Sequence, residues 1–275
     1  MPVGAVANWR LATTRSNFRL SPPEKPSPMR SLLFLSLLLL QGAQTPSAGS
    51  PEAQKTVVVE LFTSEGCSSC PPADRLLSAL GREPGIIALS FHVDYWNHLG
   101  WRDPFSSSQW SLRQRLYART FGTNRSYTPM MVIDGALDLV GSDQPRIEEA
   151  IARQRKRSND ARVTVEAVRR RDVIEVKIAA TPAGDIPRSA VFLVLLYENG
   201  LSTKVTKGEN ARRTLRHDYV VRDSRTAKWS PEQQSLELKL HPDWNPLQLG
   251  VAVLLQSPRS QKLFGAAATD VVAPE

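Results

Sequence analysis

Two cysteines, the only ones among 275 residues, lie close together as Cys67-Ser68-Ser69-Cys70. Two thiols at this spacing can close into a disulfide and reopen by thiol–disulfide exchange. Such a pair persists as a disulfide only in an oxidising compartment. The motif therefore predicts a redox-active pair, with Cys67 as the attacking thiolate and Cys70 as the resolving thiol.

The flanking sequence places this pair between a strand and a helix. Residues 56–62 are apolar and β-branched, which is typical of a buried parallel strand. Apolar residues then recur at helical spacing from Ala73 to Leu80, and Pro71 and Pro72 are tolerated in a first helical turn. We expect Cys67 at the helix cap, where unpaired N–H groups and the helix dipole lower a thiol pKa.

The loop-closure argument also favours a reactive pair over a structural one. In the chain-entropy model so short a loop gains about 2 kcal/mol, against about 3 kcal/mol for a loop of fifteen residues. A disulfide that serves only stability would more usefully join distant segments. A purely structural bridge nevertheless stays open as an alternative.

A later X-Pro bond supplies a candidate binding edge. Thr128-Pro129 opens a strand ahead of the hairpin signal Asp134-Gly135. A cis-proline at this place would lie against the disulfide and leave a backbone edge free for a substrate strand. Thr128 and Pro129 are therefore predicted to bind substrate.

Residues 92–105 form a loop that is unusually rich in aromatic and charged side chains. The loop follows a buried strand, at the sheet end where open α/β folds bind their ligands. Asp94 and Trp96 are predicted to bind substrate, and Asp94 or His92 could accept a proton from Cys70. The alternative is a rigid loop in which Trp96 is buried and the charges are paired.

The periodicity divides the chain into two folded parts. Residues 51–158 show the order β-α-β-α-β-β-α, which predicts an α/β domain with a mixed, mainly parallel sheet. Residues 159–275 show period-two strands without a convincing helix, which predicts a smaller antiparallel, sandwich-like domain. Isolated histidines there, His217 and His241, are expected to be structural.

The first 50 residues are predicted to be an extension and a signal peptide rather than part of the fold. Met29 and Arg30 precede a short apolar run, and small residues follow as far as Ala48. The run is far shorter than the ~20 residues of a spanning helix. We therefore expect translation to start at Met29, export to the periplasm or beyond, and no membrane span after cleavage.

The formal charge of +8 does not indicate nucleic-acid binding, because half of the excess lies in the first 49 residues. The remaining basic residues are scattered and lack a stripe of stacking aromatic residues. A metal site made by Cys67, Cys70, His92 and His98 is a second alternative, although a single CxxC is weak support for it. We expect neither a metal nor another cofactor.

Several segments resemble one known family. The run Glu60 to Asp74, together with residues 92–97, 100–105, 127–130 and 208–210, is similar to the motifs of a bacterial family of exported thioredoxin-like proteins. That family is known as domain of unknown function 1223, and the likeness spans roughly residues 55–270. The resemblance implies a thioredoxin-like fold and export, but no reaction. The chain departs from ordinary thioredoxins in having no Trp before Cys67 and a Ser-Ser dipeptide within the motif.

Together these observations predict thiol–disulfide exchange on exported proteins or small thiols, with a redox protein as partner. A ligand- or metal-binding envelope protein with a structural disulfide is the alternative function.

Overall fold

The computed structural model describes residues 55–273. The predicted signal peptide lies outside these residues. The described residues belong to one compact unit, residues 49–275. No helix among them combines the length and the hydrophobicity that a membrane crossing requires.

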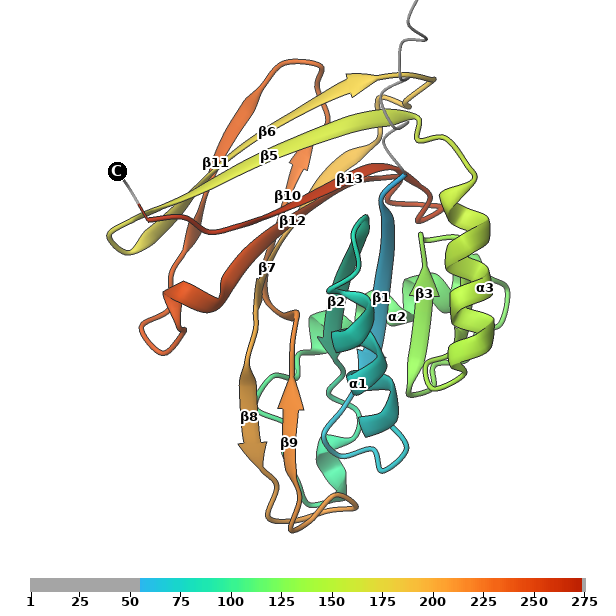
Figure 1. Cartoon of the computed structure of the whole chain (residues 1–275), viewed down its shortest axis with the longest axis vertical. Helices are drawn as coiled ribbons and strands as arrows, with labels where there is room; N and C mark the ends of the chain where they lie inside the picture. Colours follow the sequence, from blue (N-terminus) through green and yellow to red (C-terminus); the bar gives the residue numbers. More distant parts are fainter. Residues whose placement is uncertain (1–54, 274–275) are drawn as a thin grey trace, which may run out of the picture. The chain divides into compact units, whose positions relative to one another are not determined.

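The first part of the unit alternates strands and helices in the predicted order (Figure 1). It consists of β1 (Val57–Thr63), α1 (Pro71–Leu80), β2 (Ile86–His92), α2 (Ser108–Thr120), β3 (Met130–Ile133), β4 (Leu137–Val140) and α3 (Gln144–Arg155). Strands β1 and β2 are parallel and buried along their whole length, as their continuous apolar sequences predict. Asp134 and Gly135 both have positive φ and form the tight turn between β3 and β4, which the Ala136 N–H closes by donating to the Ile133 carbonyl.

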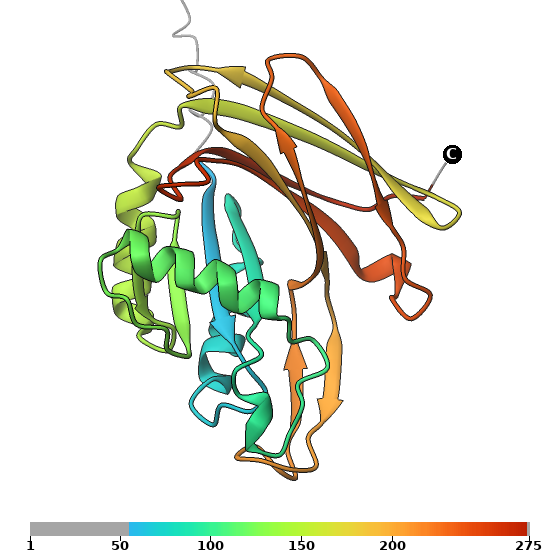
Figure 2. The same cartoon turned by 180° about the vertical axis from the view of Figure 1, so that it is seen from behind.

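The helices cover both faces of these strands. On one face, α1 and α3 bury residues such as Leu77 and Ile147 against β1 and β3. On the other face, α2 packs Trp110 and Tyr117 against Phe62 and Phe91. Figure 2 shows α2 lying across the face opposite to α1. The side chain of Ser107 caps α2 by accepting from the Gln109 backbone N–H across 3.2 Å.

The remainder of the chain consists of strands and turns. The strands are β5 (Ala161–Arg170), β6 (Val173–Pro182), β7 (Val191–Glu198), β8 (Leu201–Lys204), β9 (Thr214–His217), β10 (Val220–Lys228), β11 (Gln234–Lys239), β12 (Leu249–Gln256) and β13 (Leu263–Asp270). Short 3₁₀ turns lie at Asn97–Leu99 and Pro246–Gln248.

One large mixed sheet joins the two parts of the chain. Its strand order is β13-β12-β7-β10-β2-β1-β3-β4, so it crosses the boundary predicted near residue 158. The junction is the parallel contact of β10 with β2, where Ser90 N–H donates to the Tyr219 carbonyl across 2.8 Å. The shared core contains residues of both parts, for example Phe91 and Leu254. The division into domains stays a prediction.

Two smaller antiparallel sheets complete the unit. The sheet β11-β6-β5 packs through Val176 and Ile178 against the apolar face of β7 and β12, which forms a second core. The hairpin β8–β9 forms its own two-stranded sheet. It extends alongside α1 toward the turn that carries the two cysteines (Figure 1).

Candidate functional site

Cys67 and Cys70 form a disulfide in the turn between β1 and α1. The prediction that Cys67 caps the helix is wrong, because α1 begins at Pro71 and Cys70 occupies the N-cap. Proline is favoured at the first helical position, where its missing N–H had no partner. Pro71 therefore sets the helix start one residue after the motif. The Cys70 carbonyl accepts from the N–H groups of Ala73 and Asp74.

The disulfide is covered by protein. Both Cys67 and Cys70 have 0% exposed surface, whereas Ser68 and Ser69 between them are exposed. Exposure therefore does not distinguish the two cysteines, and the roles of Cys67 as attacking and Cys70 as resolving thiol stay predictions. A segment about 140 residues further along the chain contacts this turn, and the sequence did not place it at this site.

Residues 205–213, at the tip of the β8–β9 hairpin, pack against the backbone of the disulfide turn. The Asn210 side chain is fully buried and donates to the carbonyl oxygens of Glu65 and Cys67, each across 2.9 Å. The exposed Glu209 carboxylate accepts from the Ser68 backbone N–H across 3.0 Å. Gly208 has a φ of +76° and lies so close to Trp101 that a Cβ there would be 3.2 Å from the Trp101 Cβ. The loop is thus fitted closely onto the disulfide turn.

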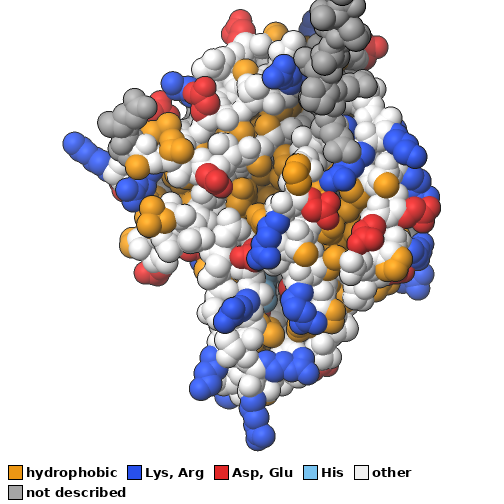
Figure 3. All heavy atoms as spheres, viewed as in Figure 1, with side chains coloured by type: hydrophobic (Ala, Val, Ile, Leu, Met, Phe, Trp, Pro, Cys, Tyr) orange, Lys and Arg blue, Asp and Glu red, His pale blue; other side chains and the backbone are white. Residues whose placement is uncertain are grey.

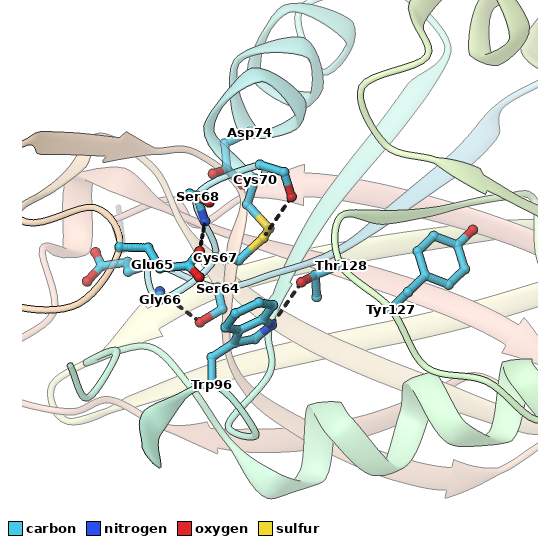
Figure 4. The surroundings of a disulfide bond; sticks show 12 residues. Ser64, Glu65, Gly66, Cys67, Ser68, Cys70, Asp74, Trp96, Tyr127 and Thr128 are labelled. Carbon is cyan, nitrogen blue, oxygen red and sulfur yellow. Dashed lines mark hydrogen bonds between the residues drawn. A yellow bond between two sulfur atoms is a disulfide. The ribbon is translucent and has the colours of Figure 1, made fainter. Parts of the chain in front are cut away.

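Trp96 lies between the disulfide turn and Thr128 (Figure 4). A Cβ on Gly66 would stand 2.9 Å from the Trp96 Cβ, so the backbone approaches this side chain closely. The Trp96 ring nitrogen donates to the Thr128 hydroxyl across 2.9 Å. Trp96 and Thr128 are both partly exposed, and they connect the aromatic loop to the start of β3.

Pro129 follows Thr128 through a cis peptide bond. A Cβ on Gly141 would stand 3.0 Å from the Pro129 Cβ and 3.1 Å from the Ala73 Cβ, so Pro129 lies beside the first turn of α1. The structure therefore brings Thr128, Pro129 and Trp96 to the neighbourhood of the disulfide. Their binding role stays a prediction.

Asp94 is directed elsewhere. Its carboxylate accepts from the Ser111 hydroxyl across 2.5 Å. The Asp94 backbone N–H donates to the Ser111 hydroxyl oxygen across 3.1 Å. These contacts attach the aromatic loop to the first turn of α2. The side chain also lines a shallow surface pocket with His98 and Arg102. Its predicted role toward substrate remains a prediction.

A buried group of charged side chains lies behind the disulfide turn. His92 donates from Nδ1 to the Asp103 carboxylate across 2.7 Å, and the Glu65 N–H donates to the same oxygen across 2.8 Å. Glu65 in turn accepts from Trp101 Nε1 across 2.8 Å and from His217 Nε2 across 3.2 Å. The side chains of Glu65, His92, Asp103 and His217 are each at most 3% exposed. We call Glu65, Asp74, His92, Asp103 and His217 the buried charge cluster.

Asp74 extends this cluster toward Cys70. It lies one helical turn after Cys70, and its Oδ2 is 4.0 Å from His217 Nδ1. Among the described residues, Asp74 Oδ1, His92 Nε2 and His217 Nδ1 are buried without a hydrogen-bond partner. Buried polar atoms of this kind are uncommon in folded proteins and indicate a role in proton chemistry or a bound water.

Burial and pairing shift the pKa values of the cluster in different directions. Burial alone would lower the pKa of His92, but the Asp103 carboxylate outweighs this effect and the pKa is raised. Burial would raise the pKa of Asp103, but His92 and its hydrogen bonds lower it. Burial raises the pKa of Asp74 despite the opposing effect of His217. His92 and Asp103 therefore form a buried ion pair, and the carboxyl group of Asp74 is more easily protonated than that of Asp103.

The sequence did not predict the roles of Asn210, Glu209 and His217. Residues 208–210 were noted only as a shared motif, and His217 was expected to be an isolated structural residue. His217 instead lies edge-on against His92, with ring centroids 4.8 Å apart. Glu65 and Asp74 lie in the run Glu60 to Asp74 that resembles the family motif, and this resemblance was the sequence signal available for them.

The alternative metal site is not assembled. Within residues 55–273, no three His, Cys, Asp or Glu side chains are placed to hold a metal ion. His98 is exposed and hydrogen bonds through Nδ1 to the Tyr95 carbonyl oxygen across 2.7 Å.

Comparisons with known proteins place the chain in a family. No curated protein matches it. A crystal structure of a protein from Agrobacterium tumefaciens is similar, with 30% identity, a TM-score of 0.61, and 81% of this chain and 96% of that chain covered. The structure of HBP35 of Porphyromonas gingivalis shares the fold at 15% identity and a TM-score of 0.57, covering 79% of this chain and 76% of that chain. The family model described as "Protein of unknown function (DUF1223)" matches residues 58–256, so the chain belongs to that family.

Proposed function

We propose that the protein is an exported thiol–disulfide oxidoreductase with a thioredoxin-like core, which acts through Cys67 and Cys70. The observation that carries the proposal is the disulfide at the turn from a central parallel strand into α1, with Cys70 at the helix N-cap. Free N–H groups and the dipole at a helix start stabilise a thiolate, and a stabilised thiolate is a good leaving group.

The reaction moves two electrons between two pairs of sulfur atoms. In the oxidised form, a substrate thiolate attacks one sulfur of the Cys67–Cys70 bond, which breaks, and a mixed disulfide forms. This first attack releases the other cysteine as a thiolate. A second substrate thiolate then attacks the substrate sulfur of the mixed disulfide and releases the first cysteine as a thiolate. The substrate leaves oxidised and the pair is reduced. A redox partner reverses these steps to regenerate the disulfide.

The buried charge cluster supports this chemistry because it can hold a proton near the pair. Reduction of the disulfide produces a thiolate at Cys70, whose carbonyl accepts from the Asp74 N–H across 3.1 Å. Burial raises the pKa of Asp74, so its carboxyl group is a suitable proton donor and acceptor. Trp96, Thr128 and Pro129 would then line the place where a substrate backbone lies, with Asp94 at the outer end of the same loop.

The burial of both cysteines favours a second candidate, a disulfide that only braces the turn. The reduction potential separates the two. A potential below about −300 mV together with no exchange would indicate a structural bridge. A higher potential with measurable exchange is the result expected for an oxidoreductase.

A trapping experiment tests the exchange directly. The Cys70→Ala variant keeps Cys67 but lacks the resolving thiol, so we expect it to accumulate mixed disulfides with disulfide-bearing peptides. The matched Cys67→Ala variant should accumulate far fewer. Mass spectrometry of the adducts identifies the linked cysteine. Recovery of no adduct from either variant would exclude exchange through this pair.

A further inference from the structure

The β8–β9 hairpin carries an unusual concentration of positive charge. Residues 201–217 contain one acidic residue, Glu209, and five exposed basic residues that we call the basic hairpin: Lys204, Lys207, Arg212, Arg213 and Arg216. In the part of the chain that the structure describes, none of these five forms an ion pair. Their charge is therefore available to a partner.

This charge surrounds the disulfide turn. Glu209 and Asn210 at the hairpin tip contact Ser68 and Cys67 directly. Figure 3 shows Lys and Arg side chains gathered on the end of the molecule formed by β8 and β9. Two further exposed basic residues follow residues that contact the hairpin. Arg102 follows Trp101, which packs on Gly208. Arg75 follows Asp74, whose carboxylate faces His217.

Glu209 shows that a carboxylate fits within this basic surface. Its Oε2 accepts from the Ser68 N–H, and its side chain is exposed to solvent. An acidic side chain of a partner could make the same hydrogen bond without further loss of solvation. Displacement of the Glu209 side chain by the partner would also weaken the contact of the next residue, Asn210. Asn210 donates to the Cys67 carbonyl oxygen.

We infer that the basic hairpin binds an acidic polypeptide segment, and that a carboxylate of this segment displaces Glu209 from Ser68 and uncovers the disulfide. The inference rests on the proposed function, because it names the class of substrate that the disulfide would meet. Opposite charge near the reactive pair raises the rate of encounter and holds the substrate close.

The hairpin composition favours a polypeptide over the other polyanions. Residues 201–217 contain no aromatic residue on which a nucleotide base could stack. None of the large exposed apolar side chains of the described residues lies on the hairpin itself. Leu99 beside Gly208 is exposed, but a single leucine offers little apolar surface for insertion into a bilayer.

A binding experiment tests the surface without relying on catalysis. Fluorescence anisotropy of a labelled peptide rich in Asp and Glu is measured for the oxidised protein and for the Lys207→Glu/Arg216→Glu variant. Arg213 is left intact because its guanidinium donates to Asn210 Oδ1 across 2.9 Å. We expect binding to weaken at least about tenfold in the variant at low salt, and the difference to fade near 0.5 M salt because charges are screened.

The matched control is Arg162→Glu/Lys177→Glu, which reverses two exposed charges on β5 and β6. It should bind the peptide like the unchanged protein. Equal binding by the hairpin variant and the control would overturn the inference. Hairpin-dependent binding to phosphatidylglycerol vesicles or single-stranded DNA, with no binding to the peptide, would also overturn it.

A second measurement separates this inference from the proposed function. Reduction of the Cys67–Cys70 disulfide is followed with two dithiol peptides, one flanked by Asp and Glu and one by Gly and Ser. In the hairpin variant, the acidic peptide should reduce the disulfide more slowly than in the unchanged protein. The rate of reduction by the neutral peptide should be the same in both proteins. If neither peptide reduces the disulfide, the proposed function fails. The anisotropy experiment would still show whether the basic hairpin binds the acidic peptide.

Discussion

The Asn210 side chain donates a hydrogen bond to the Cys67 carbonyl oxygen across 2.9 Å, although the two residues are 143 positions apart in the chain. The same amide also bonds to the Glu65 carbonyl oxygen. The contact fastens the β8–β9 hairpin to the turn that carries the disulfide. We therefore expect access to the sulfur atoms to depend on how often residues 205–213 move away from this turn.

Asn210→Ala should make the disulfide easier to reduce. Loss of the amide leaves two buried carbonyl groups without this donor, at a cost of about 1–3 kcal/mol. A loss of about 1.4 kcal/mol in the closed loop raises the population of the open form about tenfold. The rate of reduction by dithiothreitol, followed by thiol labelling, should rise by a similar factor.

Asn199→Ala is the matched control for this effect. Asn199 accepts from the Tyr219 N–H across 2.9 Å, so its loss also removes one side-chain hydrogen bond. The control should be destabilised without faster reduction at low denaturant. If both variants are reduced at the same rate, the hairpin does not limit access to the sulfur atoms.

Asp103→Asn should destabilise the fold and change its pH dependence. The substitution removes the charge partner of buried His92, and loss of one partner of a buried ion pair costs about 3 kcal/mol. An asparagine also has only one acceptor oxygen, whereas Asp103 accepts from His92, Glu65 and Phe105 through two. The free energy of unfolding in urea measures the loss.

The direction of the pH effect follows from the raised pKa of His92. Protonated His92 stabilises the folded state fully below its ordinary pKa of 6.5, and this contribution is lost as the pH rises through the higher folded-state pKa. The unchanged protein should therefore lose stability above pH 6.5, and Asp103→Asn should flatten this decline. The contribution of Asp103 itself, whose pKa is lowered, disappears only as the pH falls below 3.8. A variant with the same decline above pH 6.5 would show that the pair is not charged.

Trp96→Phe should impair exchange with peptides more than exchange with dithiothreitol. The substitution keeps an aromatic ring but removes the donor to the Thr128 hydroxyl, which joins the aromatic loop to β3 beside the disulfide. Loss of one such bond costs about 1 kcal/mol, which corresponds to a several-fold fall in kcat/KM for a peptide. Trp244→Phe, a substitution on the distant apolar core, is the control. An equal effect on peptide and dithiothreitol would argue against a substrate-binding role.

A fragment that ends at residue 158 should not fold by itself. Without β10, the edge of β2 loses the hydrogen bond between Ser90 and Tyr219. The core around Phe91 also loses Leu195, Val221 and Leu254, and Arg113 loses its bond to Gln256. Deleting large buried side chains costs about 2–5 kcal/mol each, which exceeds the stability of most domains when several are lost. Circular dichroism and urea unfolding of the fragment measure the outcome, and a cooperative transition would instead support two separable domains.

Local sequence signals predicted the elements of residues 57–155 well. Continuous apolar runs defined β1 and β2, and Asp134-Gly135 defined the turn between β3 and β4. The predictions were less accurate at helix starts. Cys70 rather than the predicted Cys67 occupies the N-cap of α1. Helix ends depend on which neighbouring group finds a partner, and several neighbours here were chemically suitable.

The sequence by itself determined that two cysteines close a disulfide at a strand-to-helix turn, because the motif and its flanking elements are local. Only the tertiary structure decided that Asn210 binds the backbone of this turn and that His217 approaches Glu65 and Asp74. Both residues reach the site because β10 adds to the edge of β2 and thereby fixes the position of the hairpin before it. Strand pairing between distant segments carries no local signature, so contacts that depend on it cannot be seen in the spacing of residues along the chain.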